Sequence, residues 1–146
     1  MKLQISSRLA IFALLELAAD PDRQLTVAEI CEKYGISSHH LAKVMHSLGR
    51  AGLVQSVRGA RGGYQFSGNP RRTTLLEVIQ LFEKFSSRDT HSEAGDRTNE
   101  GRALREVIGE IDDIVRATLG SITISTMLKL VGRRRAVSRR PVAATL

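Results

Sequence analysis

The chain has 146 residues, 42% of them hydrophobic, and a formal net charge of +7. This length and composition can build a core and predict a single domain with or without an appendage. One cysteine excludes a disulfide framework and fits a reducing cytoplasm, while 4% aromatic residues and no tryptophan argue against a stacking platform for single-stranded nucleic acid.

The first apolar run covers residues 9–15 and follows two basic residues. Glu16 interrupts it, so the run is too short to span a bilayer, and no convincing signal-peptide cleavage site follows. We interpret it as a buried first helix that is capped near Ser6 or Ser7 and is ended by Asp20-Pro21. A cytoplasmic protein without membrane contact is therefore expected.

Residues 26–52 carry the pattern of a helix-turn-helix. Thr26 and Glu29 form a capping box, Gly35 suits the left-handed position that ends the first helix, and Ser37 can cap the second. Apolar residues recur at helical spacing, as Val27, Ile30, Cys31 and Tyr34 and then as Leu41, Val44, Met45 and Leu48. The second helix of such a motif enters the major groove of DNA.

The second helix has a polar and basic side outside its apolar stripe. A helix in a groove reads bases mainly with its first turns, so the candidate readers are Ser38, His39, His40 and Lys43. Plain solvation of this side is the alternative. A metal site at the two histidines is disfavoured, because neighbours on a helix point about 100° apart. The candidate DNA-binding residues of the motif are Thr26, Ser37, Ser38, His39, His40, Lys43 and Arg50.

Residues 53–66 follow the motif directly and predict a hairpin. Two short β-prone runs flank a glycine-rich tip that carries Arg58 and Arg61. A winged helix uses such a hairpin to contact the phosphate backbone or the minor groove. A surface hairpin with solvated arginines is the alternative, but the neighbouring helix-turn-helix favours the wing. Arg58, Arg61 and Tyr64 complete the candidate DNA-binding set.

The segment after the hairpin begins with Thr74 and Glu77, a second capping box that predicts a helix through Phe85. Residues 86–101 are polar without periodicity and predict a mobile loop. A long helix is expected from Arg102.

The apolar face of this long helix is broader than one small domain needs to cover. It favours a homodimer seam with twofold symmetry over a helix folded back on its own domain. The predicted seam residues are Leu104, Ile108, Ile111, Val115 and Leu119. A short helix from Thr123 or Ser125 to Val131 and a disordered basic tail over residues 132–146 are expected to follow.

Charge is distributed unevenly along the chain. Residues 1–72 have a balance of +5, residues 73–131 of −3 and residues 132–146 of +5. The excess of positive charge in the winged-helix half and the tail is expected of a protein that contacts the DNA backbone.

Several motifs resemble the Rrf-type family of bacterial winged-helix regulators over about residues 1–131. They are Met1-Lys-Leu, the helix-turn-helix, Arg50-Ala-Gly-Leu-Val54, Ser56-Val-Arg-Gly59, Gly62-Gly-Tyr64 and Leu76-Glu-Val-Ile79. The resemblance implies a homodimeric repressor, sometimes an activator, with the long helix as its seam. It also implies that Arg58 enters the minor groove and that His39 and His40 read the operator, with His40 in place of a more usual tyrosine.

The chain departs from the cluster-binding members of that family, which place three cysteines in the segment that corresponds to residues 86–104. This chain has none there, and Cys31 lies on a buried stripe where a small inert side chain is expected. No cofactor is therefore expected. Two alternatives stay open: an iron–sulfur or redox sensor with unusual ligands, and a regulator controlled by a partner protein or small metabolite through residues 86–101.

The sequence predicts a mainly α-helical protein with a small β-wing. A winged helix-turn-helix domain is expected at residues 1–85, a polar loop at 86–101, dimerisation helices at 102–131 and a basic tail at 132–146. We expect a sequence-specific regulator of transcription, a repressor that binds a double-stranded operator as a homodimer. An enzyme is not expected, because no nucleophile–base–acid set or phosphate loop is present.

Overall fold

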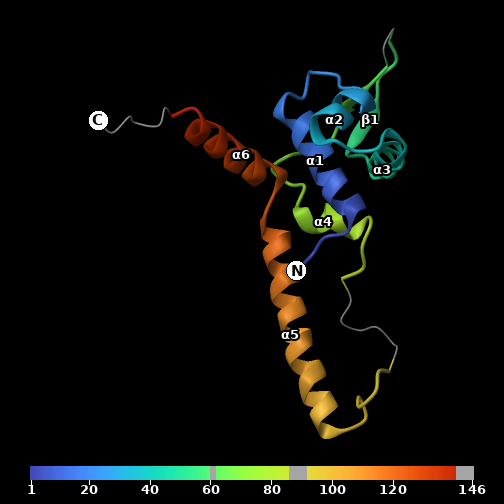
Figure 1. Ribbon diagram of the computed structural model, residues 1–146, viewed down its shortest axis with the longest axis vertical. Coiled ribbons are helices and arrows are strands. Elements are labelled where there is room, and N and C mark those ends of the chain that lie inside the picture. Colours follow the sequence, from blue (N-terminus) through green and yellow to red (C-terminus); the bar gives the residue numbers. More distant parts are fainter. Residues whose placement is uncertain (60–61, 86–91, 141–146) are drawn as a thin grey trace.

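The computed structural model describes residues 1–59, 62–85 and 92–140, which form six helices and a two-stranded hairpin. In chain order these elements are α1 Ile5–Ala19, α2 Val27–Tyr34, α3 Ser38–Arg50, β1 Val54–Ser56, β2 Tyr64–Phe66, α4 Leu75–Gln80, α5 Asn99–Ser121 and α6 Ile124–Ser138. Figure 1 shows a head made of α1–α4 and the hairpin, from which α5 extends as a long single helix while α6 leads away sideways. The predicted fold class, mainly α-helical with a small β-wing, is confirmed. No helix in the described ranges is long and apolar enough to cross a membrane.

Helix α1 lies at the centre of the core. Leu14 and Leu17 are completely buried in it, and α3, α4, α6 and β2 all pack against it. Burial of a leucine side chain contributes about 1.5–3 kcal/mol, so α1 organises the head around itself. This explains why the sequence run at residues 9–15 is apolar on every side of the helix.

The predicted cap of α1 near Ser6 or Ser7 was wrong. The helix begins at Ile5, and the preceding Gln4 makes no side-chain cap. The carboxylate of Glu83 instead accepts hydrogen bonds from the backbone amide of Gln4, at 2.9 Å, and from the buried hydroxyl of Ser7. Glu83 thus satisfies an orphan amide at the start of α1, where an acidic group is also favoured by the helix dipole.

The sequence predicted a helix that continues through Phe85. Helix α4 ends earlier, at Gln80. The next turn is tighter, because the amide of Leu81 bonds the carbonyl of Val78 and that of Phe82 bonds Ile79. Tightening by bonds to the third preceding residue is a common ending of a helix. Beyond Gln80 the rings of Phe82 and Phe85 pack against the core, whereas Leu81 is exposed.

Helix α5 begins at Asn99, three residues before its predicted start, so the last part of the predicted loop is helical. The hydroxyl of Thr98 caps it by accepting from the amide of Gly101 at 3.0 Å. The expected mobile loop falls partly on residues 86–91, which lie outside the described residues. A local cap therefore outweighed the polar composition on which the loop prediction depended.

The prediction of a disordered tail from residue 132 was wrong for its first half. Helix α6 is capped by Thr123 as expected, but it continues to Ser138. Arginine and alanine favour helices, and the run at residues 133–136 consists of these two residues. The last residues, 141–146, lie outside the described part of the chain.

The junction between α5 and α6 is joined to the head by backbone hydrogen bonds. The amide of Leu75 donates to Ile122 and the amide of Ile124 donates to Thr73, each at 2.9 Å. A further amide, from Ser125, reaches the carbonyl of Pro70 at 2.8 Å. Since Ile124 is also fully buried, α5 leaves the head from a fixed position.

Candidate nucleic-acid interface

The turn between α2 and α3 has the geometry that the sequence predicts. The hydroxyl of Thr26 accepts from the amide of Glu29 at 3.2 Å, and the Glu29 carboxylate accepts from the amide of Thr26 at 2.7 Å. Gly35 has a φ of 64°, a left-handed conformation that favours glycine, and its amide bonds the carbonyl of Cys31 at 2.8 Å. The turn therefore directs α3 away from α2 without the strain that a side chain would introduce.

Helix α3 has one buried side and one exposed side. Its buried side is formed by Leu41, Val44, Met45 and Leu48, each at most 2% exposed. The exposed side carries Ser38, His39 and Lys43 in the first turns and Arg50 in the last turn. No acidic residue occurs in α3, so this face presents hydrogen-bonding groups and positive charge alone.

Two other predicted DNA contacts at the start of α3 have distinct surroundings. Ser37 occupies the N-cap position as predicted, but its exposed hydroxyl does not bond the helix amides. His40 is half-buried, and its Nε2 lies 3.0 Å from the hydroxyl of Ser6 in α1. This bond holds the start of α3 against α1. The roles of both residues in DNA binding stay predictions.

The hairpin is antiparallel, with Val54 opposite Phe66 and Ser56 opposite Tyr64. Beyond the paired strands the amide of Val57 donates to the carbonyl of Gly63 at 2.8 Å. Gly63 has a φ of 140°, and a side chain there would lie 3.2 Å from the carbonyl oxygen of Leu25. Glycine is therefore required where the hairpin approaches the chain that precedes α2.

The hairpin is anchored to the helix-turn-helix through Tyr64. Its backbone exchanges two hydrogen bonds with Leu25, of 2.8 and 3.0 Å, directly before the cap of α2. Its half-buried ring packs against the core. Tyr64 thus positions the wing, and its predicted contact with DNA stays a prediction.

Of the two predicted wing arginines, Arg58 lies within the described residues. Arg58 is exposed and follows the last strand-paired residue of β1 by two positions. Arg61 lies outside the described residues, and its contact with DNA stays a prediction. Sequence reasoning missed Ser6 and Leu25, which position His40 and Tyr64. Neither has a local signal, because each acts on a residue more than 30 positions away.

A cluster of aromatic and charged side chains joins α1 to α2. The rings of Phe12 and Tyr34 stack with centroids 4.8 Å apart. The carboxylate of Glu16 accepts from the Tyr34 hydroxyl at 2.5 Å and forms an ion pair with Lys33. Burial opposes ionisation of Glu16, but these two hydrogen bonds and the positive charges of Lys33 and Arg135 together outweigh it and lower the pKa of Glu16. Burial and the same carboxylate raise the pKa of Tyr34, which keeps the phenol protonated.

The described residues do not fit an iron–sulfur cluster. Burial raises the pKa of the Cys31 thiol, which disfavours the thiolate that such a cluster needs. Across residues 1–59, 62–85 and 92–140, no three histidine, cysteine or acidic side chains are placed to hold a metal ion. The expectation that Cys31 is a structural residue agrees with its burial.

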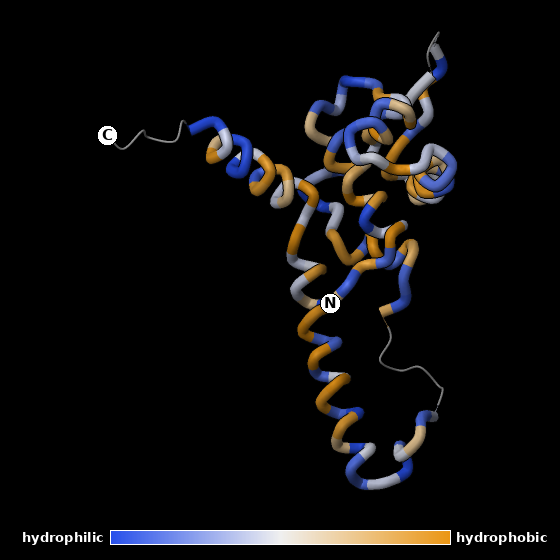
Figure 2. The backbone as a smooth tube through the Cα atoms, in the orientation of Figure 1, coloured by the Kyte–Doolittle hydropathy of each residue, from blue (hydrophilic) through white to orange (hydrophobic). Residues whose placement is uncertain are grey.

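Helix α5 has no buried residue. The predicted seam residues Leu104, Ile108 and Ile111 are 64%, 47% and 49% exposed, whereas Val115 is half-buried and Leu119 packs against the core of its own chain. Val107 and Ile114, which widen the same face, are 52% and 66% exposed. Figure 2 shows hydrophobic positions recurring along the whole length of α5. The alternative of a helix folded back on its own domain holds only for its C-terminal end.

The chain is similar to known regulators along most of its length. Residues 3–130 match the model of the Rrf2 family, described as iron-dependent transcriptional regulators. BadM of Rhodopseudomonas palustris, which is named as an HTH-type transcriptional regulator, is 47% identical over 146 residues, 99% of this chain and 93% of that protein.

Two solved structures have the same arrangement of elements. CymR of B. subtilis, the global cysteine regulator, aligns with a TM-score of 0.75 and 26% identity over 89% of this chain and 98% of its own. IscR of T. potens aligns with a TM-score of 0.73 and 25% identity over 97% of this chain and 93% of its own. The similar proteins are regulators of transcription, in agreement with the prediction that the chain is not an enzyme.

Proposed function

The chain belongs to the Rrf2 family of transcriptional regulators, and from this premise we propose that it binds operator DNA as a homodimer. In each protomer α3 enters the major groove and the hairpin contacts the adjacent backbone or minor groove. The observation that carries this proposal is the exposed face of α3, which has no acidic residue and lies beside a hairpin anchored to the same motif.

The exposed side chains of α3 suit base recognition. A major groove about 12 Å wide admits one α-helix, and its first turns then meet the base edges. His39 and Ser38 can each exchange hydrogen bonds with bases, and Lys43 can bind guanine or phosphate. Arg50 and Arg58 supply positive charge near the groove walls, where phosphates fix the register of the protein.

The dimer proposal is supported by the exposed apolar face of α5. Five large apolar side chains there are between 47% and 66% exposed, a continuous strip along one helix. Exposed apolar strips of this kind mark interaction surfaces, and a twofold axis allows the same strip to cover itself. Two recognition helices related by that axis match a palindromic operator, which is the arrangement expected of a repressor.

We further propose that this regulator acts in the cytoplasm without an iron–sulfur cluster. The sequence has no cysteine at residues 86–104, and burial of Cys31 disfavours its thiolate. Control by a small molecule is the alternative that a described feature favours, because a cavity with charged side chains lies between the head and α6.

The DNA-binding proposal is tested with sites selected from random duplex DNA. We expect Arg58→Ala to weaken operator binding and to reduce the slope of log affinity against log salt by about 1, because one phosphate contact is lost. Arg97→Ala removes another exposed arginine, from the segment that precedes α5, and serves as the control. Unchanged affinity and salt slope in Arg58→Ala would contradict the assignment of the hairpin as a DNA-binding wing.

A further inference from the structure

Helices α1, α2 and α6 enclose a cavity of about 240 Å³. Its walls combine apolar and charged side chains from the three helices. They are Leu15, Glu16 and Ala19 of α1, Lys33 and Tyr34 of α2, and Leu128, Val131, Gly132 and Arg135 of α6. The cavity therefore lies where the helix-turn-helix meets the helix that follows the dimer seam.

The charged groups of this cavity do not neutralise one another completely. Glu16 is already satisfied by Lys33 and by the hydroxyl of Tyr34. Arg135 is near enough to influence the ionisation of Glu16 and Tyr34, but among the described residues it forms no ion pair. With one carboxylate between two cations, the cavity carries a positive charge.

The apolar side chains of the lining limit which kind of anion can bind to this positive charge. Leu15 is buried, and Leu128 and Val131 are half-buried. Inorganic anions would leave these side chains without a partner, whereas an organic anion can place its carbon skeleton against them. The volume is below the roughly 300–1,000 Å³ of sites for drug-sized ligands, so the molecule must be small.

We propose that this cavity binds a small organic carboxylate. The guanidinium of Arg135 receives the carboxylate, a planar pairing that can form two parallel hydrogen bonds. The apolar body of the molecule lies against Leu15, Leu128 and Val131. Tyr34 supplies a polar wall, because its hydroxyl is held by Glu16 and its ring by Phe12.

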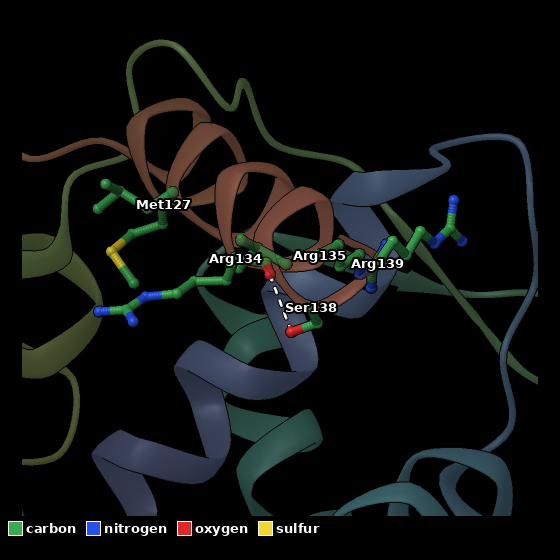
Figure 3. A pocket seen from close by; sticks show the side chains of 7 residues that line it. Met127, Arg134, Arg135, Ser138 and Arg139 are labelled. Carbon is green, nitrogen blue, oxygen red and sulfur yellow. Dashed lines mark hydrogen bonds between the residues drawn. The ribbon is translucent and has the colours of Figure 1, made fainter. Parts of the chain in front are cut away.

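A second hollow lies along α6 and differs from the cavity in the elements that line it. It has a volume of about 480 Å³, but its lining comes only from α6 and from Arg139, the residue that caps the C-terminal end of that helix. Figure 3 shows Arg134 extending beside Met127 while Arg139 extends in the opposite direction. Arg135 and Val131 contribute to both hollows, but the smaller cavity is also walled by α1 and α2.

A ligand bound in this cavity would couple its own concentration to the affinity of the protein for operator DNA. A ligand held between α2 and α6 joins the helix-turn-helix to the helix that continues from α5. It can change operator affinity only as far as it binds one arrangement of these helices more tightly than another. This regulatory consequence rests on the proposed function, whereas the binding site itself does not.

The site is tested by NMR titration of the full-length protein, without DNA, with hexanoate and phenylacetate as probes. Hexanamide and phenylacetamide are their neutral counterparts. We expect the two acids to shift the methyl signals of Leu15, Leu128 and Val131 and the amides to do so much more weakly. Arg135→Gln is expected to weaken the binding of the acids about tenfold or more, because a charge-assisted hydrogen bond is lost. Arg139→Gln, at the residue that caps the C-terminal end of α6 and lines the second hollow but not this cavity, serves as the matched control.

Three outcomes would overturn the proposal: no shift with either acid, equal shifts with acids and amides, or full binding by Arg135→Gln with an unchanged melting temperature. Operator affinity is then measured with and without the acids. A change in the wild type that Arg135→Gln lacks supports the regulatory role. Binding of the acids without any change in operator affinity overturns that role alone, and failure to bind operator at all concerns the proposed function and not the cavity.

Discussion

Helices α3 and α5 are both amphipathic, but the apolar side is buried in α3 and exposed in α5. In α3 the apolar residues are buried against the head, and the polar side is left exposed. In α5 the apolar strip that includes Ile108 and Ile111 remains exposed, and no residue of the helix is buried. In the proposed function, the exposed side of α3 contacts DNA and the exposed strip of α5 contacts a second copy of the chain.

The physical difference between the two helices lies in what the rest of the chain can cover. Helix α1 packs against the apolar side of α3. Helix α5 instead extends away from the head, and it contacts α4 only near the C-terminal end of α5, where Gly120 approaches Leu76. Burial of a large apolar side chain contributes about 1.5–3 kcal/mol, so the proposed dimer would gain stability by covering the strip on α5.

The largest expected effect comes from placing a charge in the strip on α5. Ile108→Glu should prevent dimer formation and lower operator affinity by about 10²–10⁴-fold, because the two heads no longer bind as one unit. Sedimentation and operator titration measure the two effects. Glu106→Ala, on the opposite side of the same helix, should change neither. A monomeric Ile108→Glu protein with normal operator affinity would break the link between α5 and DNA binding.

A smaller effect is expected from the exposed face of α3. Lys43→Ala should cost about 1–3 kcal/mol of operator binding and change the preferred base at one position in each half-site. Lys129→Ala, which removes an exposed lysine from α6, should leave the preferred sequence unchanged. Selection from random DNA measures both. If the Lys43→Ala protein selects the same sequence as the wild type, the assignment of α3 as the reading helix is wrong.

Cys31 tests whether the buried side of the helix-turn-helix serves structure alone. Cys31→Ser should lower the free energy of unfolding by about 1–3 kcal/mol, because a hydroxyl is less tolerated than a thiol in an apolar site. Cys31→Ala, which keeps the site apolar, should cost less. Operator binding by all three proteins should be insensitive to oxygen, nitric oxide and iron chelators. A visible absorption band that Cys31→Ser abolishes, together with altered operator binding, would show an iron–sulfur sensor instead.

The smallest effect concerns the ion pair between α1 and α2. Glu16→Gln should lower the free energy of unfolding at neutral pH by less than about 1 kcal/mol, because Lys33 is half-exposed. The pKa of Glu16 is lowered from its ordinary value of 4.5, so its contribution is complete above that value and is lost as the pH falls through the lowered pKa. Urea unfolding from pH 7 to pH 3 should therefore show the two proteins converging in acid. A constant difference across this range would mean that ionisation of Glu16 does not matter.

The sequence by itself determined those features that depend on neighbours along the chain. The capping boxes at Thr26 and Thr74 and the left-handed Gly35 were predicted correctly, because each depends on contacts within about four residues. The exposed strip on α5 was also predictable, since helical spacing alone collects apolar residues on one side. Errors arose where composition replaced a local signal, as in the arginine run that continues α6.

Tertiary structure alone decided the contacts that hold the candidate interface in place. Glu83 bonds the start of α1 across 76 to 79 residues of sequence, and His40 meets Ser6 across 34. Arg135 approaches Glu16 only because α6 packs against α1. Hydrogen bonds and charges act over a few ångströms of space, so groups this far apart in sequence become partners only once the helices have packed.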